Sequence, residues 1–393
     1  MEASGLLKWL KGSLSSPENE TGRTIMRFVH PGDDHRFFQA LQSQRQSCKA
    51  LRSVRRLGII RAYSCPVPIE QLPRKLAKSI VWEKDAIVRV DGIPETSSPF
   101  RTENGIPWGV RRIGAPDAWN RATGYRVKVG VIDTGVDFQH PDLRHSLEQG
   151  INLLQRAFLP YDDNGHGTHI AGTIAAANRL QGMMGVAPRA SIYPVKAFDY
   201  NGTAYVSDII LGIDWCVRNR MNVVNMSFGM PERSRSLLQA VTNAYRSGVL
   251  IVASSGNEGK RGKIDYPARY SQTIAVGATN RNGRVASFTN RSSYIDIYAP
   301  GEKIESCWLN GKRKTMSGTS MATSHVTGAV ALLLSYRRDL TPDQGKAVLK
   351  ASARPLRKAK ASRSPRSSAG ELNVARMLQA ADKIRQRAAP PLP

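Results

Sequence analysis

Between residues 125 and 350 the chain alternates short apolar, β-rich runs with segments long enough to form helices. Strands buried on both faces are continuous hydrophobic runs, and helix-length connections between them are typical of parallel sheets. The pattern therefore predicts an α/β fold of three layers, with helices on both faces of a mostly parallel sheet. The expected strands lie at 127–132, 191–197, 223–227, 249–254 and 273–278.

Three short segments of this region carry an acid, a base and a hydroxyl. Asp133 ends an apolar run, His166 stands between two glycines, and Ser320 follows Gly318 just before a helical pattern. Folds of this class hold their active sites at the carboxyl ends of the strands, which is where Asp133 is expected. The segments are VGVIDTGVD at 129–137, NGHGTHIAG at 164–172 and GTSMATSH at 318–325.

These motifs, in the chain order Asp, His, Ser, resemble those of the subtilisin-like serine proteases, the subtilase family, over roughly residues 105–350. The resemblance implies a subtilisin-like α/β fold and a serine endopeptidase. Ser320 would be the nucleophile, His166 the general base, and Asp133 the carboxylate that orients the imidazole. The amide of Asn257 and the backbone N–H of Ser320 would form the oxyanion hole.

Two alternatives stay open at this point. A catalytically silent peptide-binding module could use the same fold, although such a module needs neither the complete set of reactive groups nor Asn257. His166 and His169 could instead hold zinc, but no third ligand follows at a recognisable spacing. A structural role for His169 is the simpler interpretation.

The mode of substrate binding also follows from the resemblance. An extended substrate would add a strand between two short segments of the chain. Phe228, with Val206 and Ile209, would line an apolar pocket for a residue upstream of the cut. The implied binding residues are Gly202, Ser227, Phe228 and Gly229.

Asp265 takes the position that, by the resemblance, lines the floor of the primary specificity pocket, and Glu258 takes an acidic rim position. A buried carboxylate needs a cationic partner, which the side chain of a substrate Lys or Arg supplies. We therefore expect a preference for a basic residue before the cut. The alternative is that Asp265 turns outward and pairs with Lys263 or Arg269.

The sequence ahead of this region divides differently. Residues 1–24 are polar and are expected to be a flexible lead-in. The resemblance implies that residues 25–90 form a small α+β, ferredoxin-like prodomain that inhibits and helps to fold the enzyme; an unrelated accessory domain is the alternative. Residues 91–104 would be a linker, and residues 105–393 the peptidase domain with a basic C-terminal tail. The expected prodomain elements are strands at 25–29, 57–67 and 80–90 and helices at 34–46 and 69–79.

Self-processing is expected at the Arg101–Thr102 bond, close to where the family's prodomain ends. Arg101 is the only basic residue between Arg89 and Arg111, and a basic residue before the bond agrees with the preference expected from Asp265. The chain would thus be a zymogen. Its partners would be protein or peptide substrates and its own prodomain, which acts as the inhibitor.

No cofactor is expected, because Ser-His-Asp hydrolysis requires none. Calcium as a structural ion is left open. Asn104 and Asp142 match ligand positions of the family's strong calcium site, and the loop at 177–183 has the right length. Arg179 stands where that loop has an asparagine, and a cation opposes a metal. We therefore expect a salt bridge between Arg179 and Asp142 in place of the ion.

The net charge of +26 raises the question of nucleic-acid or anionic-surface partners. The basic segment near the C-terminus lacks interleaved aromatic side chains, so no specific nucleic-acid partner is expected. No stretch reaches the length of a membrane span, and the first residues do not match a secretion signal. A cytoplasmic location is therefore expected, with export by another route left open.

Overall fold

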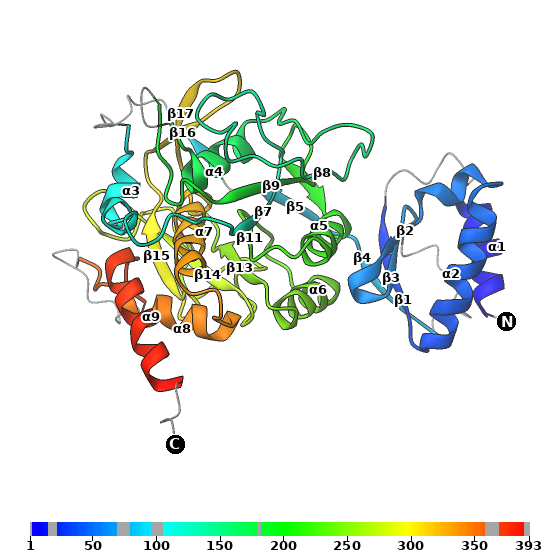
Figure 1. Ribbon diagram of the computed structural model, residues 1–393. Helices are drawn as coiled ribbons and strands as arrows, with labels where there is room; N and C mark the ends of the chain where they lie inside the picture. The colour runs from blue at the N-terminus through cyan, green and yellow to red at the C-terminus, as the bar shows by residue number, and fades with distance from the viewer. Residues whose placement is uncertain are drawn as a thin grey trace.

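The computed structural model describes residues 2–14, 22–68, 79–90, 92–95, 105–178, 182–357 and 369–388. A small N-terminal unit lies beside a larger α/β body (Figure 1). None of the helices in these ranges is both long and apolar enough to cross a membrane.

The body is built on a seven-stranded sheet in the order β15-β14-β13-β11-β7-β9-β8, and every neighbouring pair is parallel. The five strands predicted from apolar runs are confirmed. The two that were not predicted, β8 and β15, are the edge strands and have two and four residues. The bounds are β7 Lys128–Asp133, β8 Ile151–Asn152, β9 Ser191–Lys196, β11 Val223–Met226, β13 Leu250–Ser254, β14 Ile274–Thr279 and β15 Ile297–Pro300.

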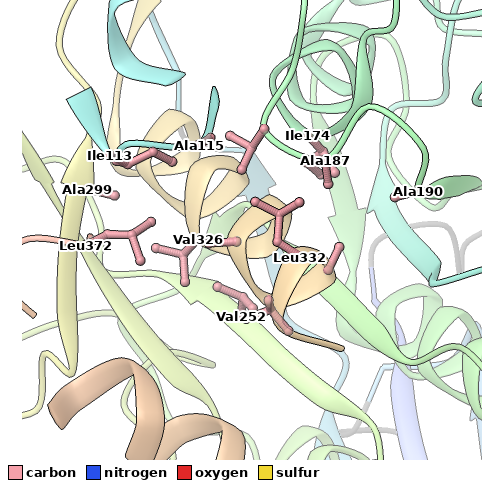
Figure 2. Close-up of a cluster of buried hydrophobic side chains, with 14 of the residues drawn as sticks. Ile113, Ala115, Ile174, Ala187, Ala190, Val252, Ala299, Val326, Leu332 and Leu372 are labelled. Carbon is pink, nitrogen blue, oxygen red and sulfur yellow. The ribbon is translucent and has the colours of Figure 1, made fainter. Parts of the chain in front are cut away.

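Helices cover both faces of this sheet, as predicted. Successive strand residues point to opposite faces. Val252 packs in the core beneath α7 (Thr319–Tyr336), whereas its neighbour Ile251 packs in the core beneath α5 (Val206–Arg218) and α6 (Arg235–Arg246). Figure 2 shows Val326 and Leu332 of α7 above Val252, and α7 is buried on all sides over most of its length. The remaining helices of the body are α3 Trp108–Arg112, α4 His166–Ala175, α8 Pro342–Ser352 and α9 Val374–Ala388.

The N-terminal unit holds an antiparallel sheet in the order β2-β3-β1-β4. This order, with a helix after the first strand, agrees with the expected ferredoxin-like α+β unit. The helix expected at 69–79 falls almost wholly outside the described residues. The elements are α1 Glu2–Leu14, β1 Thr24–Phe28, α2 Pro31–Arg45, β2 Arg55–Leu57, β3 Ala62–Cys65 and β4 Ile80–Lys84.

The flexible lead-in expected at 1–24 is wrong for residues 2–14, which form α1. Leu6, Leu7 and Leu10 lie on one face of this helix and are almost completely buried in the core of the N-terminal unit. The apolar i, i+4 spacing of Leu6 and Leu10, rather than the mean polarity of the segment, decided its structure.

The strand expected at 57–67 is also wrong, because the chain reverses within it. A 3₁₀ turn at Gly58–Ile60, followed by Arg61 with a φ of 49°, separates β2 from β3, and these two strands pair antiparallel. Because the turn contains the apolar residues Ile59 and Ile60, the hydrophobic pattern of the segment does not indicate the reversal.

The strand expected at 80–90 is two strands that belong to different units. β4 completes the N-terminal sheet, whereas β5 (Ile87–Val90) joins the body between β10 (Thr203–Tyr205) and β12 (Phe228–Gly229) (Figure 1). Part of the expected linker forms a strand as well. There β6 (Ile93–Pro94) pairs with β17 (Arg313–Ser317), which pairs in turn with β16 (Ile304–Cys307).

Candidate active site

Asp133 and His166 meet at the carboxyl end of the central sheet. Asp133 is the last residue of β7, and His166 is the first residue of α4. His166 Nδ1 lies 2.7 Å from Asp133 Oδ1, which also accepts the backbone N–H of Thr134 at 2.8 Å. Both side chains are buried. The carboxylate therefore favours the tautomer with a proton on Nδ1, in which Nε2 is the basic nitrogen.

The turn before α4 aims His166 at this carboxylate. Gly165 has a φ of 104°, a conformation that residues with a Cβ rarely adopt, and a Cβ there would overlap the ring of Trp308. The side-chain oxygen of Asn164 accepts the backbone N–H of His166 at 3.1 Å. The glycine before the histidine is thus required by the turn.

Ser320 is the second residue of α7, the helix that packs against α4. Its side chain is fully buried, and its Oγ donates to the carbonyl of Ser227 at 3.0 Å. Ser227 directly follows β11, so Ser320 also lies at the carboxyl end of the sheet. The N-terminus of a helix carries partial positive charge, which favours negative charge developing beside Ser320.

Asn257 is oriented by the residue before Ser320. Its Oδ1 accepts the backbone N–H and the hydroxyl of Thr319 at 2.8 and 2.9 Å. A backbone N–H can only donate, so the amide oxygen must face Thr319 and Nδ2 must face the other way. This is the orientation that a donor to an oxyanion needs. The next residue, Glu258, is half exposed and accepts the side-chain amide of Asn290 at 2.5 Å, which agrees with a rim position.

Two further histidines of the motifs are neutral structural groups. His169 is fully buried, with Nε2 at 3.1 and 3.2 Å from the carbonyls of Ile304 and Lys314. His325 is fully buried within α7. Burial lowers the pKa of His169 to about 3 and that of His325 to about 4. His169 Nε2–H donates to these carbonyls, so this nitrogen has no lone pair to offer a metal. The structural role of His169 is therefore supported, and the zinc alternative is not.

Asp265 is buried beside the loop that carries Asn257. It is 8% exposed, and a Cβ at Gly256 would stand 2.6 Å from its Oδ2. Within the described ranges Asp265 forms no ion pair, and Arg269 lies over two tyrosine rings. Burial, and next the charge of Glu258, raise the pKa of Asp265 to about 6. The outward-turned alternative is therefore wrong, and among the described residues Asp265 has no cation in salt-bridge contact, although the charge of Lys260 acts on it.

The strands expected to hold a substrate backbone hold a segment of the chain itself. In the β5–β12 pair Val90 lies opposite Phe228, and Arg89 lies opposite Gly229. The N–H of Val90 donates to the carbonyl of Gly202 at 3.1 Å. Gly202, Phe228 and Gly229 thus bind an extended backbone by strand addition, which is the mode expected from the sequence.

An apolar side chain of this segment is buried where the sequence predicted an apolar pocket. Val88 belongs to the same buried cluster as Val206, Ile209 and Phe228, and its exposed fraction is 1%. Burial of the Val88 side chain therefore helps to hold β5 in this site.

The same segment continues past His166 along β17. A Cβ at Gly92 would stand 3.2 Å from His166 Cδ2 and 3.7 Å from Nε2. Ile93 lies opposite Ser317, whose hydroxyl donates to Glu95 at 2.5 Å. Described residues on both sides of position 91 thus lie in extended conformation across the site. The sequence had assigned them to the end of the prodomain and to a linker.

Two carboxylates that the sequence did not single out bind the N-terminal unit to the body. Glu83 accepts the backbone N–H groups of Arg235 and Ser236 at 3.0 and 2.9 Å, at the start of α6. Asp85 accepts the N–H and the hydroxyl of Ser207 at 2.9 and 2.7 Å, at the start of α5. Each carboxylate accepts hydrogen bonds from N–H groups that have no partner within the helix, and its negative charge is stabilised by the partial positive charge of the helix N-terminus. In the sequence these contacts are indicated only by two acidic residues, Glu83 and Asp85, within a predicted strand. The residues that they bind are at least 122 positions away in the chain.

Asp142, the described member of the suspected calcium site, is engaged by protein groups. It accepts hydrogen bonds from Arg313 at 3.0 Å and from Asn178 at 2.8 Å. The salt bridge expected between Arg179 and Asp142 lies outside the described residues, and among the described residues Arg313 is the cation paired with Asp142. Four residues singled out from the sequence lie outside the described ranges: Arg101, Thr102, Asn104 and Arg179.

Residues 124–375 match the model of the subtilase family. An alkaline protease of Alkalihalobacillus alcalophilus is 46% identical over 242 residues, which are 61% of this chain and 63% of that protein. Subtilisin Savinase of Lederbergia lenta is 47% identical over 229 residues, covering 58% and 84% of the two chains. Subtilisin E of Bacillus subtilis (strain 168) is 44% identical over 253 residues, covering 63% and 66%.

The chain therefore spans about 63% of the length of the alkaline protease. The family match covers the central sheet and the segments that carry Asp133, His166 and Ser320, whereas the N-terminal unit lies outside it. On its matched sequence and its parallel sheet with helices on both faces, the chain belongs to the subtilase family of serine proteases.

Proposed function

We propose that this protein is a serine endopeptidase that acts through Ser320, His166 and Asp133. The observation that carries the proposal is the buried 2.7 Å contact of His166 Nδ1 with Asp133, with Ser320 at the start of the adjacent helix. Ser320 Oγ attacks the peptide carbonyl while His166 takes its proton, and the oxyanion receives hydrogen bonds from Asn257 Nδ2 and the Ser320 N–H. His166 then protonates the leaving amine, and a water activated by His166 hydrolyses the acyl-enzyme.

Hydrolysis of a fluorogenic peptide by wild type beside Ser320→Ala tests this activity. We expect turnover by the wild type and none by the variant, with identical far-ultraviolet circular dichroism. Equal turnover by both proteins would mean that another group performs the chemistry. The peptide-binding alternative has no support from the named relatives, which are proteases.

The N-terminal unit is proposed to keep the chain in a zymogen form. Its support is the position of β5, which fills the strand-addition site between β10 and β12 that a substrate would use. The two carboxylates at the starts of α5 and α6 hold the unit against the same face of the body. An incoming peptide must displace this segment before it can bind.

The bond cut in self-processing is proposed to be the one that joins residue 91 to Gly92. Its support is the register. Val90 is bound to Gly202 on one side of the site, Ile93 is paired with Ser317 on the other, and Gly92 lies against His166. Residue 91 is an aspartate rather than a basic residue. A tethered segment reacts with an effective concentration as high as about 10⁵–10⁸ M, so a cut within the chain does not need the preferred side chain.

Intact mass and N-terminal sequence of purified wild type beside Ser320→Ala test this proposal. We expect Ser320→Ala to stay whole and the wild type to yield a chain that begins at Gly92. A chain that begins at Thr102 would favour the Arg101–Thr102 bond suggested by the sequence. A wild type that stays whole while it hydrolyses peptides would refute self-processing but not the peptidase activity.

A preference for Lys or Arg before the cut is proposed for substrates supplied in solution. Its support is the buried carboxyl of Asp265, whose pKa is raised to about 6 and for which the described residues provide no ion pair. A substrate cation placed beside Asp265 would favour the ionised carboxylate and donate charge-assisted hydrogen bonds to it.

A further inference from the structure

Asp142 lies where the sequence matches a ligand of the family's strong calcium site, yet both of its oxygens are already bound. Oδ2 accepts from Arg313 Nη2 at 3.0 Å and from Nε at 3.3 Å, and Oδ1 accepts from Asn178 Nδ2 at 2.8 Å. The Asp142 side chain is 3% exposed, and that of Arg313 is 29% exposed. The carboxylate is therefore neutralised by a guanidinium fork and an amide of the protein.

Both described ends of the loop beside Asp142 lie close to it. The N–H of Ala177 donates to the Asp142 carbonyl at 2.8 Å. Gly182, at the other end of the loop, packs so closely that a Cβ there would overlap Asp142 Oδ1 and the Asn178 amide. Calcium takes six to eight oxygen ligands at about 2.3–2.6 Å. Here the Asn178 group that faces the carboxylate is an N–H donor, so the part of the donor set that the structure describes, Asp142 and Asn178, does not fit calcium.

A softer metal does not fit either. His140 and Cys307 have ligand atoms within 4.8 Å of the Asp142 carboxylate, but both donors of His140 are engaged. His140 Nε2 lies 2.8 Å from the Lys312 carbonyl, and its Nδ1 accepts the backbone N–H of Asp142 at 3.1 Å. Of the described residues in this cluster, only the buried thiol of Cys307 remains beside Asp142, which falls short of the three or four protein ligands of a zinc site.

We propose that Arg313 serves as a built-in cation that takes the role of the structural calcium ion at Asp142. Arg313 is the first residue of β17, so its fork ties the β16–β17 hairpin to the turn after β7 and to the loop that begins at Asn178. An ion at the ligand positions named above would also neutralise Asp142, but it would tie Asp142 to the loop at 177–183 and not to the β16–β17 hairpin. The stability that this position gives to the fold would then depend on a side chain and not on calcium. The inference concerns folding and stands whether or not the chain hydrolyses peptides.

Thermal unfolding of the full chain carrying Ser320→Ala, so that no self-digestion intervenes, tests the proposal. We expect the same Tm in EDTA and in millimolar calcium chloride. Arg313→Gln should lower the Tm by roughly 4–8 °C, because it leaves a buried carboxylate without its cation. Lys312→Gln is the matched control: it removes a charge from an exposed position of the same hairpin and should leave the Tm unchanged.

The pair itself is tested by Asp142→Asn alone and combined with Arg313→Gln. We expect the double variant to lose less Tm than the sum of the two single losses. A calcium-dependent rise in Tm that appears only after Arg313→Gln would support the proposal. A calcium response of the parent chain that Asp142→Asn abolishes would overturn it. So would an unchanged Tm of Arg313→Gln. If Arg313→Gln does not fold, Arg313→Lys replaces it and should fold with a Tm below that of the parent chain. A Tm of Arg313→Lys equal to that of the parent would show that the two N–H donors of the guanidinium are not needed.

Discussion

Replacing Asp265 by asparagine should remove the preference for arginine while preserving the shape of the site. Raising the pKa of this carboxyl from 3.8 to about 6 means that its ionisation costs roughly 3 kcal/mol more than that of an exposed aspartate. A guanidinium beside Asp265 offsets that cost, and asparagine offers it no charge. After allowance for solvent screening and for ordering of the substrate side chain, we expect a loss of about 2–3 kcal/mol, or about 30- to 150-fold in kcat/KM.

The assay compares two peptides that differ only in arginine or phenylalanine before the cut. Asp265→Asn should lower kcat/KM for the arginine peptide and leave that for the phenylalanine peptide equal or higher. Glu258→Gln is the matched control, because Glu258 is half exposed and should change the ratio only a few-fold. Asp265 becomes protonated as the pH falls through about 6, so the wild-type preference should fade below that pH and be complete above it. An arginine-to-phenylalanine ratio that is the same in wild type and Asp265→Asn would refute the reasoning.

Three further predictions follow from the same contacts. Asn257→Ala should lower kcat about 10²–10³-fold with little change in KM, which steady-state kinetics will measure. The magnitude is the one known for the corresponding loss in a subtilisin. Glu83→Gln should weaken the docking of the N-terminal unit by about 1 kcal/mol, seen as roughly five-fold faster hydrogen exchange of β5 in the Ser320→Ala chain. Urea unfolding of the Ser320→Ala chain should show that the free energy of unfolding falls as the pH drops from about 6.5 toward 4. We expect a loss of about 1.4 kcal/mol per pH unit for each of His169 and His325, because in this range only the unfolded chain protonates them. His325→Gln should reduce that slope, and an unchanged slope would contradict the assignment.

The central sheet and the reactive residues were predictable because their signals are local. A strand buried on both faces is a continuous apolar run, and each motif places glycines where the turn needs them, as Gly165 does before His166. Asn257 and Asp265 were found only through the resemblance, since an asparagine after a glycine is otherwise a common turn. The structure then added what the resemblance could not give, namely that Asp265 is buried and that Asn257 turns its oxygen toward Thr319.

The N-terminal quarter was less predictable because its structure depends on distant partners. β5 is a strand only because β10 and β12 stand on either side of it, and nothing in its own four residues distinguishes it from an extension of β4. Likewise, the cation beside Asp142 comes from Arg313, 171 residues later in the chain. The sequence suggested Arg179, which stands where the family's calcium loop has an asparagine and which lies outside the described residues. Proximity in sequence is a poor guide to partners of a buried charge when sheets bring distant segments together.

The most direct test of the central claim is covalent labelling of the processed chain with a fluorophosphonate, followed by peptide mapping. Such a reagent reacts with a serine activated by an adjacent base. We predict one label per chain, located on Ser320, and no label in His166→Ala. A label of equal extent in Ser320→Ala or in His166→Ala would contradict the proposed nucleophile and base.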